Sequence, residues 1–406
     1  MRSVLLAASL FLLAPSFAQQ PPPPEDPVRR TIEAINGLLK QRPEDGTLWF
    51  YLARSQAQAG DRQASLAALG KVLDYGEGFL PMREGGFETL WDDPQFRDLR
   101  AKLEAKLPRL DFAPTAIELE DRGILPEGIA YDLPSKAFFI GSIAQKRILR
   151  VADGGGVGEF AGAEARLDSI LGLAVDAPRR ILYAVSTSAL TEAGRKNPRN
   201  VIVAFDVDTR KLMRRVEVPM AAQLNDVAVA RGGRVFASDS ASGAIYEIPS
   251  EGPPRTLVPP NQLRGANGLA ASLDAKRLYV AHSTGLAVVD IETGAWKRVA
   301  MATKENASAI DGLYEWQGQL IGVQNLTTPG RVILITLSPD GASVTKIQTL
   351  LSHHHNALDE PTTGVVTERG FFLLAATGVT HYNERGEITE PDKVPRPAVV
   401  RIPLPR

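Results

Sequence analysis

The chain has 406 residues, a formal net charge of −1 at pH 7 and no cysteine. The lack of cysteine excludes disulfides, thiolate metal sites, cysteine nucleophiles and a lipid-modified N-terminal cysteine. Lysine and arginine are scattered along the sequence and form no basic stripe, which argues against a nucleic-acid partner. A chain of this size can bury a sufficient hydrophobic core without disulfides.

The first 18 residues have the pattern of a secretory signal peptide. Arg2 gives a positive start, residues 4–13 are almost wholly apolar, and residues 16–18 fit a small-x-small cleavage site ending at Ala18. The apolar stretch is too short to span a membrane, and no later segment is apolar enough. A buried N-terminal helix is the alternative, but the proline run at 21–24 favours a stiff spacer over 19–27. We expect an exported protein, periplasmic or secreted, with no membrane span.

Residues 28–108 are expected to form a small helical region. Apolar residues recur there at three- and four-residue spacings, and Pro43, Gly60 and Gly76 provide helix stops. Residues 49–75 resemble one tetratricopeptide repeat. A single repeat cannot bury its own apolar face, so it must pack on other helices or on the next domain. Two interpretations stay open: a module that docks a protein partner, or a stabilising appendage.

From Leu125 onward the pattern changes to short strands separated by turns, and one phrase of the type Gly-Leu-Ala-Val-Asp occurs six times. Its copies begin at Gly128, Gly172, Asp226, Gly268, Gly312 and Gly364, so they start 42 to 54 residues apart. This spacing suits one four-stranded sheet per copy and predicts a six-bladed β-propeller over 112–406. An open sandwich is the alternative. A strand at 398–404 or at 117–119 is expected to complete the last blade.

In a propeller the innermost strand of each blade lines the central channel, so residues at one phase of the repeat form a ring. The residues just before the six phrases are Glu127, Leu171, Asn225, Asn267, Asp311 and Thr363. Four of them, Glu127, Asn225, Asn267 and Asp311, carry the side-chain oxygens that hard cations prefer, which predicts one divalent cation, best Ca²⁺, on the axis. The alternative is that these residues cap turns.

The ends of the second strands are predicted to form a second ring above the ion. Its members are Ser142, Ser186, Asp239, His282 and Gln324. Of these, His282 can act as a general base or orient a substrate, although capping the end of a strand is an equal alternative. Three adjacent histidines at 353–355 cannot all face one metal, so we interpret them as a solvated loop.

The four axial motifs resemble those of the regucalcin–gluconolactonase family and, more distantly, of the paraoxonases and diisopropylfluorophosphatase. The motifs are Glu127-Gly, Asn225-Asp, Asn267-Gly and Asp311-Gly, and the resemblance covers about residues 125–404. It implies a divalent cation held directly by Glu127, Asn267 and Asp311, Asn225 on the metal or the substrate, and hydrolysis of lactones or related esters. Gln223 stands where sugar lactonases often have an arginine, which weakens an aldonolactone assignment.

These observations predict metal-assisted hydrolysis of a lactone or small ester. Asp311 or His282 would activate the attacking water, and direct attack by Asp311 is a second route. The residues expected to contact the substrate are Asn225, Gln223, Asp239, Gln324, Ser142 and Ser186. The rival hypothesis is a non-catalytic, metal-stabilised propeller that serves as an exported binding or scaffolding module.

Overall fold

The computed structural model describes residues 27–153 and 155–405. The predicted signal peptide and the predicted linker as far as residue 26 lie outside these ranges. None of the helices within them combines the length and the apolar character that crossing a bilayer requires.

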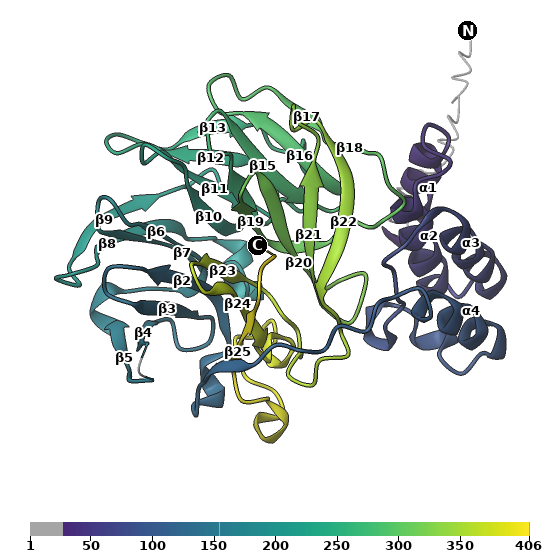
Figure 1. Cartoon of the computed structure of the whole chain (residues 1–406), viewed down its shortest axis with the longest axis horizontal. Helices are drawn as coiled ribbons and strands as arrows, with labels where there is room; N and C mark the ends of the chain where they lie inside the picture. Colours follow the sequence, from purple (N-terminus) through teal and green to yellow (C-terminus); the bar gives the residue numbers. More distant parts are fainter. Residues whose placement is uncertain (1–26, 154, 406) are drawn as a thin grey trace, which may run out of the picture.

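The described residues form six sheets, antiparallel except for one short edge strand, around a common channel, which confirms the predicted six-bladed β-propeller (Figure 1). The innermost strands contact one another in the closed ring β2–β6–β10–β14–β19–β23–β2. Blades one and two contain β2 (Pro126–Asp132), β3 (Ala137–Ser142), β4 (Ile148–Ala152), β5 (Val157–Ala161), β6 (Ser169–Asp176), β7 (Ile181–Thr187), β8 (Asn200–Asp206) and β9 (Leu212–Glu217). Blades three and four contain β10 (Leu224–Val229), β11 (Val235–Asp239), β12 (Ile245–Ile248), β13 (Arg255–Val258), β14 (Leu269–Ala271), β15 (Arg277–His282), β16 (Gly285–Asp290) and β17 (Trp296–Arg298).

Blade five has an additional fifth strand, and blade six takes its outer strand from the start of the domain. Blade five contains β19 (Ile310–Trp316), β20 (Gln319–Gln324), β21 (Arg331–Leu337) and β22 (Ser343–Leu351), with the short β18 (Ala300–Met301) added parallel to β22. Blade six contains β23 (Gly364–Thr367), β24 (Gly370–Ala376), β25 (Ala398–Ile402) and β1 (Thr115–Glu118). Both candidate closing strands are therefore used: β25 is the third strand and β1 pairs with it on the outside. The two ends of the domain thus meet in one sheet.

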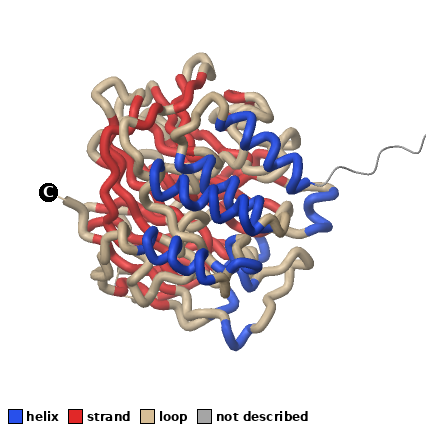
Figure 2. Tube along the Cα trace, turned by 90° about the vertical axis from the view of Figure 1, so that its right-hand side faces the viewer, coloured by secondary structure: helices blue, strands red, loops and turns tan. Residues whose placement is uncertain are grey.

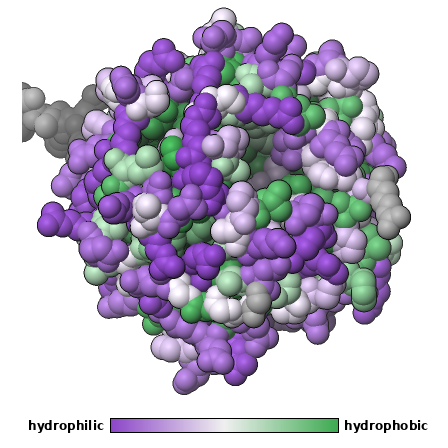
Figure 3. All heavy atoms as spheres, turned by 60° about the vertical axis from the view of Figure 1, so that its left-hand side comes forward, coloured by the Kyte–Doolittle hydropathy of each residue, from purple (hydrophilic) through white to green (hydrophobic). Residues whose placement is uncertain are grey.

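Apolar side chains between neighbouring blades form the core. The first and last blades pack through the rings of Phe138 and Phe372, whose centroids lie 4.9 Å apart, and blades one and two through Phe160 and Phe205 at 5.8 Å. Such aromatic pairs add to the free energy gained by burial alone. The outer surface in Figure 3 is mostly hydrophilic, with hydrophobic side chains scattered over it and around a hollow. This pattern matches the alternation of inward and outward residues along each strand.

Four helices precede the propeller: α1 (Pro27–Leu39), α2 (Gly46–Gln58), α3 (Arg62–Tyr75) and α4 (Pro94–Glu104). The side chains of Asp45, Asp61 and Asp93 accept hydrogen bonds from the first backbone amides of α2, α3 and α4, which explains where these helices begin. Phe50 and Phe87 are fully buried in the core that the helices share. A further short helix, α5 (Glu192–Lys196), lies in a propeller loop.

The helical region packs against blades four and five (Figures 1 and 2). The Tyr51 hydroxyl donates a hydrogen bond of 2.9 Å to the carbonyl oxygen of Ser283. The backbone amides of Glu77 and Leu80 donate to the carbonyl oxygens of Lys304 and Thr327, each also at 2.9 Å. These hydrogen bonds show that one face of the helical region contacts the propeller of the same chain. The likeness to a tetratricopeptide repeat and the docking of a protein partner stay predictions.

Candidate metal centre and the cavity above it

Four innermost strands carry a β-bulge at the position of the predicted axial ring. In β2, β6, β10 and β19 the pairing register shifts across residues 127–128, 171–172, 225–226 and 311–312. A bulge places two residues opposite one and re-aims their side chains, which is common next to functional sites. It explains how consecutive residues can both serve the centre: Asn225 lines the cavity at one mouth, while Asp226 lines the channel below it.

The carboxyl groups of Glu127, Asp226 and Asp311 lie near enough to one another for their charges to interact, although no choice of oxygen atoms brings all three within 4.8 Å of one another. Glu127 is only 7% exposed, and its Oε2 atom is buried without a hydrogen-bond partner. Burial raises the pKa of Glu127 well above its usual range, and the charges of Asp311 and Asp226 raise it further. Among residues 27–153 and 155–405, no lysine, arginine or histidine forms an ion pair with any of the three.

Asp311 is held by two amide side chains. Asn267 Nδ2 donates to Asp311 Oδ1 at 2.8 Å, and Asn325 Nδ2 donates to Oδ2 at 2.7 Å. Burial raises the pKa of Asp311 to about 6, although these two hydrogen bonds favour its ionised form. The structure thus brings two of the predicted ligands, Asn267 and Asp311, into direct contact. Each donating amide keeps its side-chain oxygen free to face a cation.

Asp226 occupies the place that glycine takes in the other five phrases. Its carboxylate accepts hydrogen bonds from the backbone amides of Leu269 and Val227, at 2.9 and 2.8 Å. Burial nevertheless raises the pKa of Asp226 to about 7. A β-carbon on Gly172 would lie 2.5 Å from Asp226 Oδ1, so the neighbouring glycine leaves the room that this carboxylate fills.

The chemistry of this centre fits a hard divalent cation. Like charges buried together are costly, and a divalent cation among them offsets both their repulsion and their desolvation. The unsatisfied Glu127 Oε2 is the kind of buried acceptor that such a cation would satisfy. Carboxylate and amide oxygens, without sulfur, suit Ca²⁺ better than Zn²⁺ or Cu²⁺. Glu127, Asn225, Asn267 and Asp311, with Asp226 and Asn325 beside them, supply enough oxygen atoms.

A cavity of about 970 Å³ lies above the centre, between the propeller and the helices. Its floor includes Asn225, Asn267, Asp311 and Asn325. Residues of α1 and α2 form a second wall, with Ile35 and Leu38 giving it apolar surface. The wall also carries Arg30, Arg54, Tyr51 and Ser55, and Arg264 faces it from blade four. The helical region therefore forms part of the cavity rather than a separate appendage.

His282 also lines this cavity, at the end of β15. Burial, with the Arg42 charge as a smaller cause, lowers the pKa of His282 to about 4, so its imidazole is neutral near pH 7. Its Nδ1 accepts a hydrogen bond of 3.4 Å from the Thr284 amide, so we assign the imidazole proton to Nε2. This tautomer makes Nε2 a donor, which suits orienting a substrate better than accepting a proton from water.

Four residues predicted to form the second ring lie elsewhere. Ser142, Ser186, Asp239 and Gln324 are fully buried and do not line the cavity. Ser142 Oγ donates to the Ile124 carbonyl, Ser186 Oγ accepts from the Asp168 amide, and Asp239 accepts from the amides of residues 222, 223, 241 and 242. Gln324 donates to two backbone carbonyls and accepts from Arg331.

The four residues are buried because the end of a second strand adjoins turns whose backbone groups need hydrogen-bond partners. The side chains of these residues supply those partners. Gln223 is partly buried beside this group, and the cavity lining does not include it. The expectation of a solvated loop at 353–355 is also wrong, because His355 is buried and His353 is nearly so.

Sequence reasoning missed three residues of the centre. Asp226 was visible as the only non-glycine at its phase of the repeat. Asn325 directly follows Gln324, which was predicted to end its strand. Extending the predicted ring by one residue would have included Asn325. Tyr314 carries no sequence signal; its hydroxyl accepts from the Gly364 amide at 2.8 Å, and burial with the charge of Asp226 raises its pKa well above its usual range.

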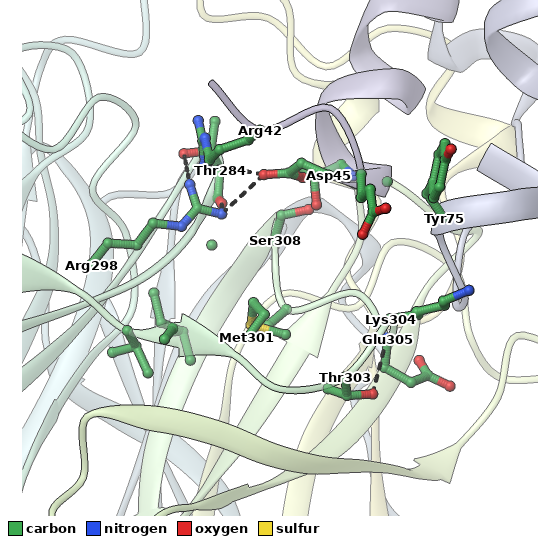
Figure 4. Close-up of a pocket in the computed structure, with 18 of the residues that line it drawn as sticks. Arg42, Asp45, Tyr75, Thr284, Arg298, Met301, Thr303, Lys304, Glu305 and Ser308 are labelled. Carbon is green, nitrogen blue, oxygen red and sulfur yellow. Dashed lines mark hydrogen bonds and ion pairs between the residues drawn. The ribbon is translucent and has the colours of Figure 1, made fainter. Parts of the chain in front are cut away.

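A second hollow, of about 740 Å³, lies where the helical region meets blades four and five (Figure 4). Arg298 and Asp45 face each other across it, with Arg298 Nη2 3.4 Å from Asp45 Oδ2. Arg42 pairs with the same carboxylate at 3.1 Å. These contacts join the two parts of the chain, and the axial carboxylates are not among the lining residues.

Comparison with known proteins found distant structural neighbours. No protein-family model and no curated protein matches the sequence. Among solved structures, a gluconolactonase from Xanthomonas campestris is 16% identical, with 73% of this chain and 99% of that chain covered and a TM-score of 0.46. A PQQ-bound aldose sugar dehydrogenase from Streptomyces coelicolor is 17% identical over 71% and 96% of the two chains, with a TM-score of 0.47.

A streptogramin B lyase is 14% identical over 66% of this chain and 82% of its own, with a TM-score of 0.49. These neighbours are a lactonase, a dehydrogenase and a lyase, so their reactions differ. Likenesses of this degree carry no argument about the reaction, which must be argued from the site.

Proposed function

We propose that this chain is a metal-dependent hydrolase that opens a lactone or small ester at the propeller axis. The observation that carries the proposal is the group of three carboxyls, Glu127, Asp226 and Asp311, which lack a cationic partner in the described ranges and of which Asp311 lines the large cavity. A compensating cation would offset the repulsion and the desolvation that otherwise favour protonation of these groups. An open cavity at the same place gives that cation access to a small molecule.

A divalent cation held by Glu127, Asn225, Asn267 and Asp311 would polarise the substrate carbonyl as a Lewis acid. The chain's own residues would do the rest. Asp311, which lines the floor of the cavity, is placed to accept the proton of the attacking water. As the water oxygen bonds to the carbonyl carbon, the carbon–oxygen ester bond breaks, and the proton passes to the leaving oxygen. The Nε2 hydrogen of His282 would orient the substrate.

The cavity walls indicate the class of substrate. Arg30, Arg54 and Arg264 line it, and within the described part of the chain none of their guanidinium groups pairs with a carboxylate. Arg54 lies over the Tyr51 ring at 5.0 Å, and its buried Nε has no hydrogen-bond partner. Unpaired guanidinium groups favour an anionic group on a ligand. We therefore propose a substrate that joins a carboxylate or another anion to an apolar body facing Ile35 and Leu38.

The experiment is a panel of lactones and aryl esters, with and without a carboxylate, tested against the full chain before and after removal of divalent cations. Turnover should require Ca²⁺ or another divalent cation and should be lost in Asp311→Asn. The matched control is Asp98→Asn, which changes an exposed aspartate on α4. Turnover that survives both chelation and Asp311→Asn would overturn the mechanism. Cation-dependent thermal stabilisation without any turnover would favour the non-catalytic scaffold.

The signal-peptide pattern of the first 18 residues adds that this reaction takes place after export. A cell that carries the chain with its own N-terminus should therefore show the activity outside the cytoplasm. Recovery of the uncleaved chain from the cytoplasmic fraction would contradict export.

A further inference from the structure

Glu104, His353 and His354 form a second cluster of possible metal ligands. None of the three lines the cavity above the propeller axis. Glu104 is the last residue of α4, and the two histidines follow β22 in the connection to blade six. One potential ligand atom from each of the three lies within 4.8 Å of the other two. His353 Nε2 is 3.6 Å from Glu104 Oε1, and the two imidazole rings lie 4.0 Å apart at their centroids.

The surroundings of the cluster orient the groups as ligands. Arg100 donates to Glu104 Oε2 at 2.9 Å, which leaves Oε1 facing His353. Arg100 is itself fixed, because it lies over the Trp91 ring at 5.3 Å and donates to the Pro81 carbonyl at 3.2 Å. Second partners that fix a carboxylate or an imidazole are typical of metal sites.

The two histidines have complementary settings. The His354 Nδ1 atom is 3.0 Å from Ser352 Oγ, a contact that fixes the ring and leaves Nε2 for a ligand. The His353 side chain is 12% exposed, and its Nε2 is buried without a hydrogen-bond partner. The facing Glu104 Oε1, at 3.6 Å, is beyond hydrogen-bond distance, so a ligand between the two atoms would satisfy both. His355 is excluded, because its ring contacts the Ala113 carbonyl and the Ala357 amide.

We propose that Glu104, His353 and His354 bind a transition-metal cation, best Zn²⁺, at the junction of α4 and the blade-six connection. Two imidazoles and one carboxylate suit Zn²⁺, with water as a fourth ligand, and do not suit Ca²⁺. The ligands come from both parts of the chain. The cation would therefore clamp the helical region, which forms a wall of the candidate substrate cavity, onto the propeller. This inference does not depend on the proposed hydrolysis.

The test is isothermal titration of Zn²⁺ into the metal-free full chain, made in the Asp311→Asn background to weaken the axial site. We expect one site, and at least tenfold weaker binding in His354→Ala and in Glu104→Gln. The control is His381→Ala, whose side chain lies outside the cluster and should leave the affinity unchanged. His353 is largely buried, so replacing it risks unfolding the chain. Glu104→Gln changes a partly exposed side chain at the end of α4 and is expected to keep the fold.

Substituting Co²⁺ provides a second measurement that a merely structural role for these residues would not change. Its visible spectrum should show imidazole ligation in a low-symmetry site and should lose this signature in His354→Ala. Zn²⁺ binding equal in the parent and in both cluster variants would overturn the proposal, and so would the absence of any Zn²⁺ binding by the parent chain.

Discussion

Asn267 and Asp311 belong to adjacent blades and share a hydrogen bond of 2.8 Å at the mouth of the channel. Asn267 precedes β14, and Asp311 lies in the bulge of β19. The bond links two blades through the same side chains that are proposed to hold the cation. Cation binding should therefore depend on the packing between blades, and the blades should in turn be stabilised by the cation.

Asp311→Asn should abolish the thermal stabilisation that a divalent cation gives. In the parent chain, Ca²⁺ at one hundred times its dissociation constant should add about 2.7 kcal/mol to the free energy of unfolding. Without Ca²⁺ the variant should be as stable as the parent or more so, because a buried like charge is removed. Scanning calorimetry with and without Ca²⁺ measures both effects. An equal Ca²⁺-induced shift in the variant would show that Asp311 is no ligand.

Asp226→Asn should change how the stability of the metal-free chain depends on pH. The folded carboxyl has a pKa of about 7 against a usual 3.8, so it holds its proton more tightly than the unfolded chain does. Its contribution is therefore complete below pH 3.8 and is lost as the pH rises through about 7. Relative to the variant, the parent should lose about 2–3 kcal/mol between pH 5 and pH 8, because each pKa unit corresponds to 1.36 kcal/mol.

Urea unfolding of both chains at several pH values measures this difference. Added Ca²⁺ should cancel or reverse it, since the cation favours the ionised carboxylate. A difference between parent and variant that stays constant from pH 5 to pH 8 without metal would contradict a buried, protonated Asp226.

Gly172→Ala should disturb the centre without changing any charge. The new β-carbon would lie 2.5 Å from Asp226 Oδ1 and 2.7 Å from its α-carbon, and the backbone there cannot move aside easily. We expect a loss of about 1–3 kcal/mol of stability from overpacking, together with weaker Ca²⁺ binding. Gly158→Ala, where nothing lies within 4 Å of the added carbon, is the matched control. Unchanged Ca²⁺ affinity in a destabilised Gly172→Ala chain would separate the glycine from the metal centre.

Arg54→Met should discriminate between anionic and neutral substrates. The methionine keeps most of the apolar contact over Tyr51 but removes the charge that faces the cavity. A hydrogen bond to a charged group contributes about 1.5–3 kcal/mol, so kcat/KM for a carboxylate-bearing ester should fall about tenfold or more. The value for its neutral analogue should change little. Arg385→Met, an exposed arginine in a propeller loop, is the control. Equal losses on both substrates would exclude an anion-binding role.

The propeller and the phase of its axial ring were predictable from the sequence because they follow from repetition. Each phrase of the repeat occupies the same place in its blade, so Asn267 and Asp311 meet although 44 residues separate them. The bulges were not predictable, because a shift in pairing register depends on partner strands that one sequence segment does not specify. For that reason Asn225 was chosen as a candidate ligand and the adjacent Asp226 was overlooked.

The predicted second ring of residues differs from the structure for another reason. Polar residues at the ends of apolar strands can face a cavity or satisfy the backbone of the neighbouring turn, and the sequence pattern is the same in both cases. Asp239 and Ser142 serve the backbone, whereas His282 faces the cavity. The part that α1 and α2 play in the cavity depends on how two regions dock. The spacing of apolar residues within either region carries no information about this docking.

The most direct test of the central claim is a crystal structure of the chain grown with Ca²⁺ and measured for anomalous scattering. We expect one peak on the propeller axis, with oxygen atoms of Glu127, Asn267 and Asp311 at about 2.3–2.6 Å from it. A well-ordered axis without such a peak, with the Glu127 carboxyl satisfied by protein groups alone, would contradict the metal centre and the hydrolysis that depends on it.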